Sequence, residues 1–175
     1  MYLFLEWYEE IRDFLEMGGP VLRVIGVLTF VMWVLIFDRV AFYRFGYPQL
    51  MRSVVDTWAG RRERSSWHAR QIRDALISRV SLSIEERLPL IKTLVALCPL
   101  LGLLGTVTGM IEVFEVMAFS GSGNPRSMAA GVSKATIPTM AGMVAALSGV
   151  IAVTMLSRFA HRAMEHLRAE LTTKG

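Results

Sequence analysis

Two long uncharged stretches constrain the fold of this chain more than any other feature. They run from Thr93 to Ile111, which is 19 residues, and from Ala135 to Leu156, which is 22 residues. A helix of about 20 apolar residues spans the hydrocarbon core of a bilayer, and it satisfies its own backbone hydrogen bonds there. Each stretch is therefore predicted to cross a membrane as a helix.

A third apolar segment precedes them, from Met17 to Phe37, and Arg23 is its only charge. The long side chain of Arg23 can reach the lipid headgroups. Hydrophobic residues make up 53% of the chain, which is more than an ordinary soluble protein contains. The sequence predicts an all-α polytopic membrane protein with three transmembrane helices, of which the second and third are long and extend into the cytoplasm.

The basic residues alternate between the two sides of the predicted membrane. Lys and Arg number two up to Arg23, eleven from Arg39 to Lys92, two from Ile111 to Lys134 and four after Leu156, so that one side carries fifteen and the other four. Short loops rich in Lys and Arg stay in the cytoplasm. The N-terminus is therefore expected in the periplasm and the C-terminus in the cytoplasm. Because membrane topology accounts for the distribution of the basic residues, no nucleic-acid partner is expected.

Seven segments follow from these patterns. They are a periplasmic amphipathic helix (1–16), transmembrane helix one (17–37), a cytoplasmic helical region (38–92), transmembrane helix two (93–116), a periplasmic hairpin (117–127), transmembrane helix three (128–157) and a cytoplasmic tail (158–175). Within the cytoplasmic region, apolar stripes predict two helices with a break near Gly60. Ser83 followed by Glu86 resembles a capping box, which predicts that the second membrane helix begins there. The basic run from Arg61 to Arg64 could contact anionic lipid, although a solvated helix end is the simpler interpretation.

Small residues recur at helical spacing in the second and third membrane segments. In the second segment this face consists of Cys98, Gly102, Gly105, Gly109 and Glu112, and in the third of Ala135, Thr139, Gly142, Ala146 and Gly149. Faces of this kind allow close helix packing in lipid. A second interpretation is that Thr106 and Thr139, on or beside these faces, line a polar path through the membrane.

These segments also carry a resemblance to a known family. The stretches from Pro99 to Met110 (PLLGLLGTVTGM) and from Gly131 to Ala146 (GVSKATIPTMAGMVAA) resemble the paired signature of the MotA/TolQ/ExbB proton-channel family, and are most similar to ExbB. The three spans, the large cytoplasmic connection and the basic tail follow the ExbB and TolQ plan. The similarity therefore covers most of the chain.

The resemblance implies a subunit of a motor in the inner membrane of a Gram-negative bacterium, driven by the proton motive force. In such a motor several copies, usually a homo-pentamer, surround an ExbD-type single-span partner and act on a TonB-type protein to energise import across the outer membrane, including iron uptake. The proton-carrying aspartate belongs to the partner. Thr106 and Thr139 match the family's threonines and would form polar walls of the proton pathway. A TolQ-like role in envelope maintenance remains an alternative.

One position departs from the family pattern. Many ExbB proteins have a glutamate five residues before the threonine of the third span, whereas this chain has Lys134. A lysine is a cation at neutral pH and does not act as a carboxylate relay. Lys134 is expected at the periplasmic membrane edge, where it pairs with Glu112, with Glu115 or with a partner protein.

No enzyme, cofactor or metal site is expected. The sequence has no Gly-rich loop followed by Lys-Ser or Lys-Thr for phosphate binding. His161 and His166 are five residues apart, so they do not share a helix face and make a poor metal pair. A rival hypothesis from another class is a passive oligomeric membrane scaffold, in which the small-residue faces hold helices together without ion movement.

Overall fold

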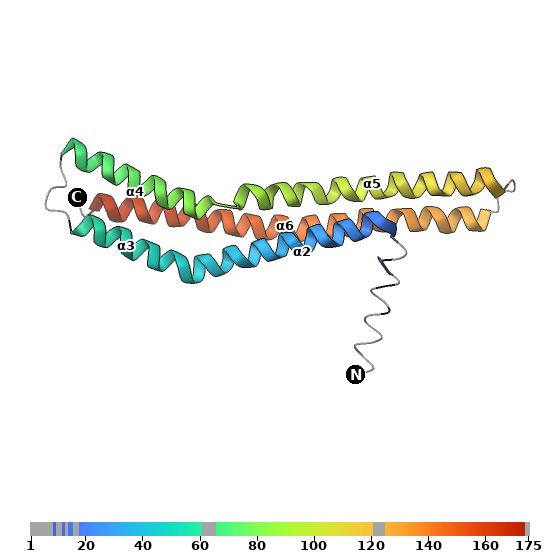
Figure 1. Ribbon diagram of the computed structural model, residues 1–175, viewed down its shortest axis with the longest axis horizontal. Coiled ribbons are helices and arrows are strands. Elements are labelled where there is room, and N and C mark those ends of the chain that lie inside the picture. The colour runs from blue at the N-terminus through green and yellow to red at the C-terminus, as the bar shows by residue number, and fades with distance from the viewer. Residues whose placement is uncertain are drawn as a thin grey trace. The chain divides into compact units, whose positions relative to one another are not determined.

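The computed structural model describes Glu9, Arg12, Phe14, Leu15 and residues 18–60, 66–120 and 125–173, and every regular element among them is helical. In chain order the elements are α2 (Gly19–Ala41), the π-helix η1 (Phe42–Gly46), α3 (Tyr47–Ala59), α4 (Trp67–Glu85), α5 (Leu88–Ser120) and α6 (Pro125–Thr173) (Figure 1). The predicted all-α fold class is confirmed. Most of the predicted N-terminal helix, the basic run from Arg61 to Arg64 and residues 121–124 of the hairpin lie outside the described residues.

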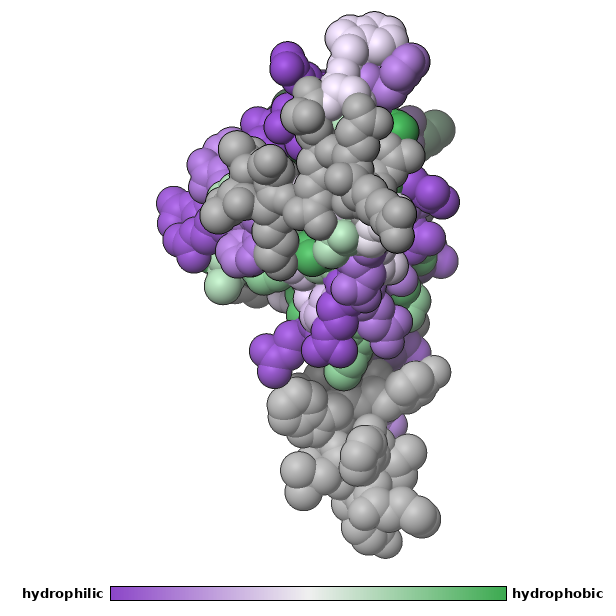
Figure 2. Space-filling view, turned by 90° about the vertical axis from the view of Figure 1, so that its left-hand side faces the viewer, coloured by the Kyte–Doolittle hydropathy of each residue, from purple (hydrophilic) through white to green (hydrophobic). Residues whose placement is uncertain are grey.

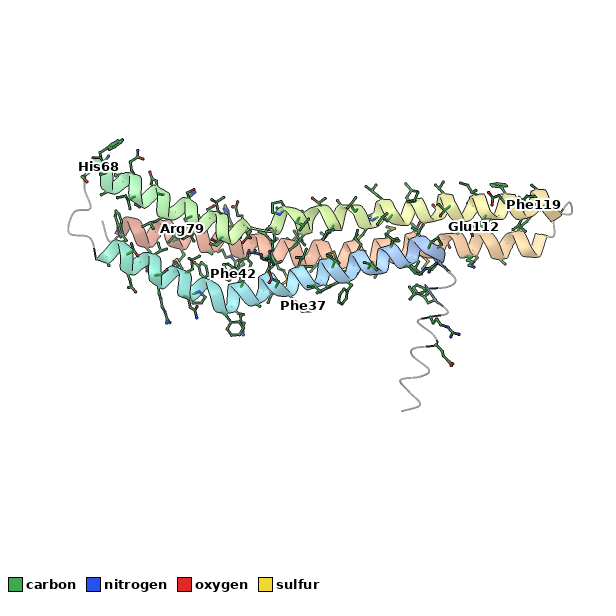
Figure 3. All side chains as sticks on the ribbon, in the orientation of Figure 1. Phe37, Phe42, His68, Arg79, Glu112 and Phe119 are labelled. Atoms are coloured by element: carbon green, nitrogen blue, oxygen red, sulfur yellow. The ribbon has the colours of Figure 1, made fainter. Side chains whose placement is uncertain are left out.

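Three helical stretches are long and apolar enough to cross a membrane. They are Gly19–Ala59, Trp67–Phe119 and Met128–Glu170, which confirms the predicted number. Large apolar side chains are exposed along each stretch, including Phe30 (70% exposed) and Val144 (67% exposed). Phe37, labelled in Figure 3, is exposed as well. Because lipid tails solvate such side chains and water does not, this surface is that of a membrane protein.

The chain divides into two compact units, and the first contains residues 1–33 and 93–150. Here the first part of α2, most of α5 and the first half of α6 run side by side (Figure 1). A core cluster of this unit consists of the small buried residues Cys98, Ala145 and Ala146, against which Leu28 of α2 packs. Small side chains at this position bring the helix backbones close together.

The second unit contains residues 34–92 and 151–175. Its core is built from larger side chains, with Trp58, Ile84 and Leu167 each at most 2% exposed. The ring of Tyr43 stacks on Phe159 of α6 with 4.8 Å between ring centroids. Hydrophilic side chains gather on the face where α3 and α6 end and α4 begins, as Figure 2 shows. The buried interior of this unit is therefore apolar, while large apolar side chains such as Phe37 and Ile151 remain exposed on its surface.

The helix ends of the second unit agree only in part with the sequence. Helix α3 ends at Ala59, and Gly60 follows as its cap, so the predicted break near Gly60 is confirmed. The predicted capping box at Ser83 is wrong, because α4 continues to Glu85 and the Ser83 hydroxyl donates to the carbonyl oxygen of Arg79 at 3.2 Å. The chain instead turns at Arg87, whose φ of 64° lies in the left-handed region.

Candidate functional site

The small-residue faces of α5 and α6 lie against each other in the first unit. A Cβ atom built on Gly142 would lie 2.5 Å from the carbonyl oxygen of Cys98 and 3.2 Å from the Cα atom of Gly102. The first of these distances is shorter than real side chains tolerate. The two helices therefore meet backbone to backbone, and glycine is required at this contact.

The same contact continues along both helices. A Cβ atom on Gly109 would lie 2.7 Å from the Cβ atom of Ala135, and one on Gly105 would overlap the ring of Pro138. At the other end of the interface, a Cβ atom on Gly149 would meet Val95 at 2.6 Å and the sulfur of Met32 in α2 at 2.7 Å. Ala146 is buried in the core cluster with Cys98. The structure thus places all seven glycine and alanine residues of the two small-residue faces at, or next to, a neighbouring helix.

Thr139 adds a hydrogen bond across this interface. Its hydroxyl donates to the carbonyl oxygen of Gly102 at 2.8 Å, from α6 to α5, and the group is partly buried. The bond is possible because Gly102 has no side chain to cover its carbonyl. Hydrogen bonds between helices in lipid contribute about 0.6–2 kcal/mol each. Thr139 therefore links the two helices as well as contributing a polar atom to their contact.

Thr106 makes a different bond. Its hydroxyl donates to the carbonyl oxygen of Leu103 within α5 at 2.7 Å. A hydroxyl has one donor and two acceptor lone pairs, so the donors of both Thr106 and Thr139 are already used. What the two side chains can offer to water or to a proton carrier is an acceptor oxygen. Their hydroxyls bond separate carbonyls and not each other.

A cavity of about 220 Å³ lies beside this interface, between the start of α2, the second half of α5 and the first part of α6. Glu112 and Lys134 both line it, together with Gly18, Gly19, Pro20, Gly105, Thr108, Gly109, Val113, Val116, Met117, Met128, Gly131, Ala135 and Pro138. Figure 3 labels Glu112 on α5. The cavity therefore combines an apolar wall with one carboxylate and one ammonium group.

The structure brings Lys134 and Glu112 to one cavity but forms no ion pair between them. Within the part of the chain that the structure describes, the ion pairs are made by other residues, and Lys134, Glu112 and Glu115 are all exposed. Glu115 does not line the cavity. The predicted pairing of Lys134 with one of these glutamates is thus not formed within this chain.

A polar cluster in the second unit has no counterpart in the sequence predictions. Arg39 is only 3% exposed, and it donates to the carbonyl oxygen of Ser83 at 3.0 Å and to the carboxylate of Glu86 at 3.3 Å. The hydroxyl of Tyr43 donates to the carbonyl oxygen of Ile84 at 2.8 Å. The last four carbonyls of a helix have no partner within that helix, so Arg39 and Tyr43 satisfy two of those that end α4.

Burial governs the chemistry of this cluster. Desolvation raises the pKa of Tyr43, and the charge of Glu85 raises it further, while the nearby Arg39 charge opposes the shift. An exposed ion pair joins Asp38 to Arg87 at 2.7 Å on the rim of the cluster. The only sequence signal for this site was a charged pair directly after an apolar helix, which is also what a membrane boundary looks like.

The described residues contain no group of three or more His, Cys, Asp or Glu side chains that could hold a metal ion. What they do contain is three membrane-length helices, a backbone contact between two of them, and hydroxyl groups within that contact. These features define a polytopic α-helical membrane protein with polar groups inside its helix packing.

Residues 46–169, which are most of the chain, match the MotA/TolQ/ExbB proton channel family. The chain belongs to this family, and the family predicted from the two sequence motifs is confirmed. It is a family of channels rather than a class of enzymes.

Individual relatives agree with this assignment. An ExbB-like biopolymer transport protein of Synechocystis is 37% identical over 83 residues, covering 46% of this chain and 33% of that protein. The biopolymer transport protein exbB1 of Vibrio cholerae is 45% identical over 74 residues, covering 42% and 32%. The Tol-Pal system protein TolQ of Haemophilus influenzae is 33% identical over 75 residues, covering 43% and 33%. The matched region spans about a third of the length of these curated relatives.

Proposed function

We propose that this chain is an ExbB-type subunit of an inner-membrane motor that is driven by the proton motive force and energises TonB-dependent transport across the outer membrane. The observation that carries the proposal is the contact between α5 and α6, in which Thr139 bonds the Gly102 carbonyl inside a glycine-lined interface. The family match and the similarity to ExbB-type proteins support it.

The motor needs a path for protons and a surface along which a partner can move. In the proposal, Thr106 and Thr139 supply acceptor oxygens to the path, while an ExbD-type single-span protein supplies the group that carries the proton. A charge that crosses the membrane potential yields about 2.3 kcal/mol per 100 mV. Several such steps drive small shifts of one helix set against another.

Topology and assembly belong to the same proposal. The excess of Lys and Arg between the first two spans and after the third supports a periplasmic N-terminus and a cytoplasmic C-terminus. Five copies of the chain would surround the ExbD-type partner and act on a TonB-type protein. Lys134 takes no part as a carboxylate relay, since its side chain carries an amine and no carboxylate.

Native mass spectrometry of the chain co-expressed with an ExbD-type protein tests the assembly. We expect five copies that retain two partners. A homo-oligomer that never retains a partner would overturn the motor proposal and support the passive scaffold. Uptake of a TonB-dependent nutrient, measured alongside detergent resistance of the envelope, distinguishes the ExbB role from the TolQ role that the similarity to TolQ proteins suggests.

Thr139→Val tests the polar wall. Valine keeps the shape of threonine and removes the hydroxyl, so we expect an assembled complex with energised uptake reduced at least tenfold. The loss of one interhelical hydrogen bond costs about 0.6–2 kcal/mol, which is too little to prevent assembly. The measurement is nutrient uptake in cells that hold the partner-bound complex at the wild-type level.

Two variants serve as controls. Thr139→Ser restores a hydroxyl and should restore most of the uptake. Thr136→Val removes a hydroxyl from the same helix, but that hydroxyl is exposed and donates to Ser133 within α6 at 2.7 Å, so uptake should not change. Full uptake by Thr139→Val would exclude a role for its hydroxyl in the proton path.

A further inference from the structure

The cavity beside the α5–α6 interface holds two opposite charges that do not neutralise each other. Glu112 and Lys134 line the same space of about 220 Å³, and no ion pair joins them. Among the described residues neither charge has an ion-pair partner. A charge without a partner at the edge of a membrane segment is costly, unless a bound group carries the complementary charge.

The rest of the lining is apolar and continues to the outer surface. Val113, Met117, Met128 and Pro138 line the cavity, and Val116, which also lines it, is 60% exposed. The hydroxyl of Thr108 is committed to the carbonyl oxygens of Leu104 and Gly105 within α5. The ligand that fits such a space is small and carries both charges, and its uncharged part is apolar.

We propose that this cavity binds the headgroup of a phospholipid carrying a primary ammonium and a phosphate, as phosphatidylethanolamine does. The carboxylate of Glu112 accepts hydrogen bonds from the lipid ammonium, and the ammonium of Lys134 donates to the phosphate. The exposed apolar rim at Val116 accommodates the start of the acyl region. A choline headgroup has no N–H to donate, so it binds more weakly than ethanolamine.

The charge requirement follows from the same geometry. A purely anionic lipid satisfies Lys134 and leaves Glu112 facing a like charge, which is unfavourable. Reversing both charges, in the double variant Glu112→Lys with Lys134→Glu, preserves the match for a headgroup in the opposite orientation. The site therefore selects for a zwitterion and not for either charge alone.

Native mass spectrometry of the full chain, purified from nanodiscs of defined composition, tests this proposal. We expect retained phosphatidylethanolamine in preference to phosphatidylcholine and phosphatidylglycerol. Glu112→Gln and Lys134→Gln should each lower its retention about tenfold, since a hydrogen bond to a charged group contributes about 1.5–3 kcal/mol. The double charge reversal should recover most of the loss.

Glu115→Gln is the matched control, because Glu115 is an exposed carboxylate on the same helix that does not line the cavity. The Glu115→Gln variant should retain as much phosphatidylethanolamine as the wild-type chain does. All three substituted positions are exposed, so the variants should fold, and equal Tm values check this. Lys134→Arg keeps the cation and should keep the lipid.

Three results would overturn the proposal. In the first, retention does not respond to either single substitution. In the second, phosphatidylglycerol is retained equally well and depends on Lys134 alone, which describes a simple anion site. In the third, free phosphoethanolamine binds with the expected variant pattern while no lipid is retained, which keeps the charge match but assigns the site to a soluble ligand.

Discussion

The two units of this chain join their helices by opposite means. In the first unit, α5 and α6 meet through glycine, and the backbone of one helix touches the backbone of the other at Gly142 and Cys98. In the second unit, long side chains make the connection, as where Arg39 and Tyr43 reach the carbonyl oxygens at the end of α4. The first contact leaves no room for adjustment, whereas the second depends on flexible side chains.

The difference follows from the side chains that each unit buries. Small residues at the contact between α5 and α6 let close packing and the hydrogen bond of Thr139 supply the attraction. In the second unit, burial of large apolar groups such as Trp58 supplies much of it. Substitutions of the glycines in the first unit should therefore act through steric overlap, and those of Arg39 or Tyr43 in the second through lost hydrogen bonds.

The largest effect is expected at Gly142. Valine at this position would place its Cβ atom against the Cys98 carbonyl, which belongs to the backbone and has no rotamer to change. Overpacking of a core costs up to about 3 kcal/mol, and in a chain of this size each kcal/mol lowers Tm by roughly 2–4 °C. Thermal unfolding of purified Gly142→Val in detergent measures the loss.

Gly26 provides the control for this substitution. It lies in α2 of the same unit, but a Cβ atom there has no neighbour within 4 Å. Gly26→Ala should therefore leave Tm unchanged or slightly higher, because alanine favours the helix. If Gly142→Val unfolded at the wild-type temperature, the backbone contact between α5 and α6 would not limit stability.

A smaller effect is expected for Arg39→Met in the second unit. Methionine keeps the apolar stem and removes the donor to the Ser83 carbonyl, which is then left without a partner at a cost of about 1–3 kcal/mol. The ion pair with Glu86 contributes little, because that glutamate is 64% exposed.

Asp38→Ala breaks only an exposed pair and should cost less than about 1 kcal/mol. Equal losses of Tm in the two variants would contradict this ranking.

The smallest effect concerns alkaline pH. The pKa of Tyr43 is raised by burial, so above about pH 10, the ordinary tyrosine pKa, the unfolded chain loses a proton that the folded chain retains. The stability that Tyr43 contributes is present below that pH and is lost as pH rises toward the folded pKa. Tyr43→Phe should show a shallower decline of Tm between pH 9 and 11. Parallel curves for the two proteins would exclude this contribution.

The sequence predicted the first unit more fully than the second. The spacing of glycines and alanines indicated which faces of α5 and α6 are narrow, and those faces lie against each other in the structure. The small residues of each helix recur at every third or fourth position, so they lie on one face and can be recognised within a single segment of the sequence. A periodic pattern in one segment therefore implies a matching pattern in its neighbour.

The polar cluster of the second unit could not be found in this way. Arg39 bonds residues 83 and 86, and no local pattern connects positions so far apart in sequence. The same contact explains the error at Ser83. Because Arg39 and Tyr43 satisfy the carbonyls at the end of α4, that helix continues past the residue that looked like the start of the next one.

The approach of α6 to the α5 backbone also limits how this chain can diverge during evolution. A side chain that arises at Gly142 meets the carbonyl of Cys98, which is present whatever residue occupies that position. No second substitution in α5 removes this obstacle, so a compensating mutation is not available. Met143 and Val144, which are 54% and 67% exposed, can exchange with other apolar residues. Among descendants of this sequence the glycine should persist while its immediate neighbours drift.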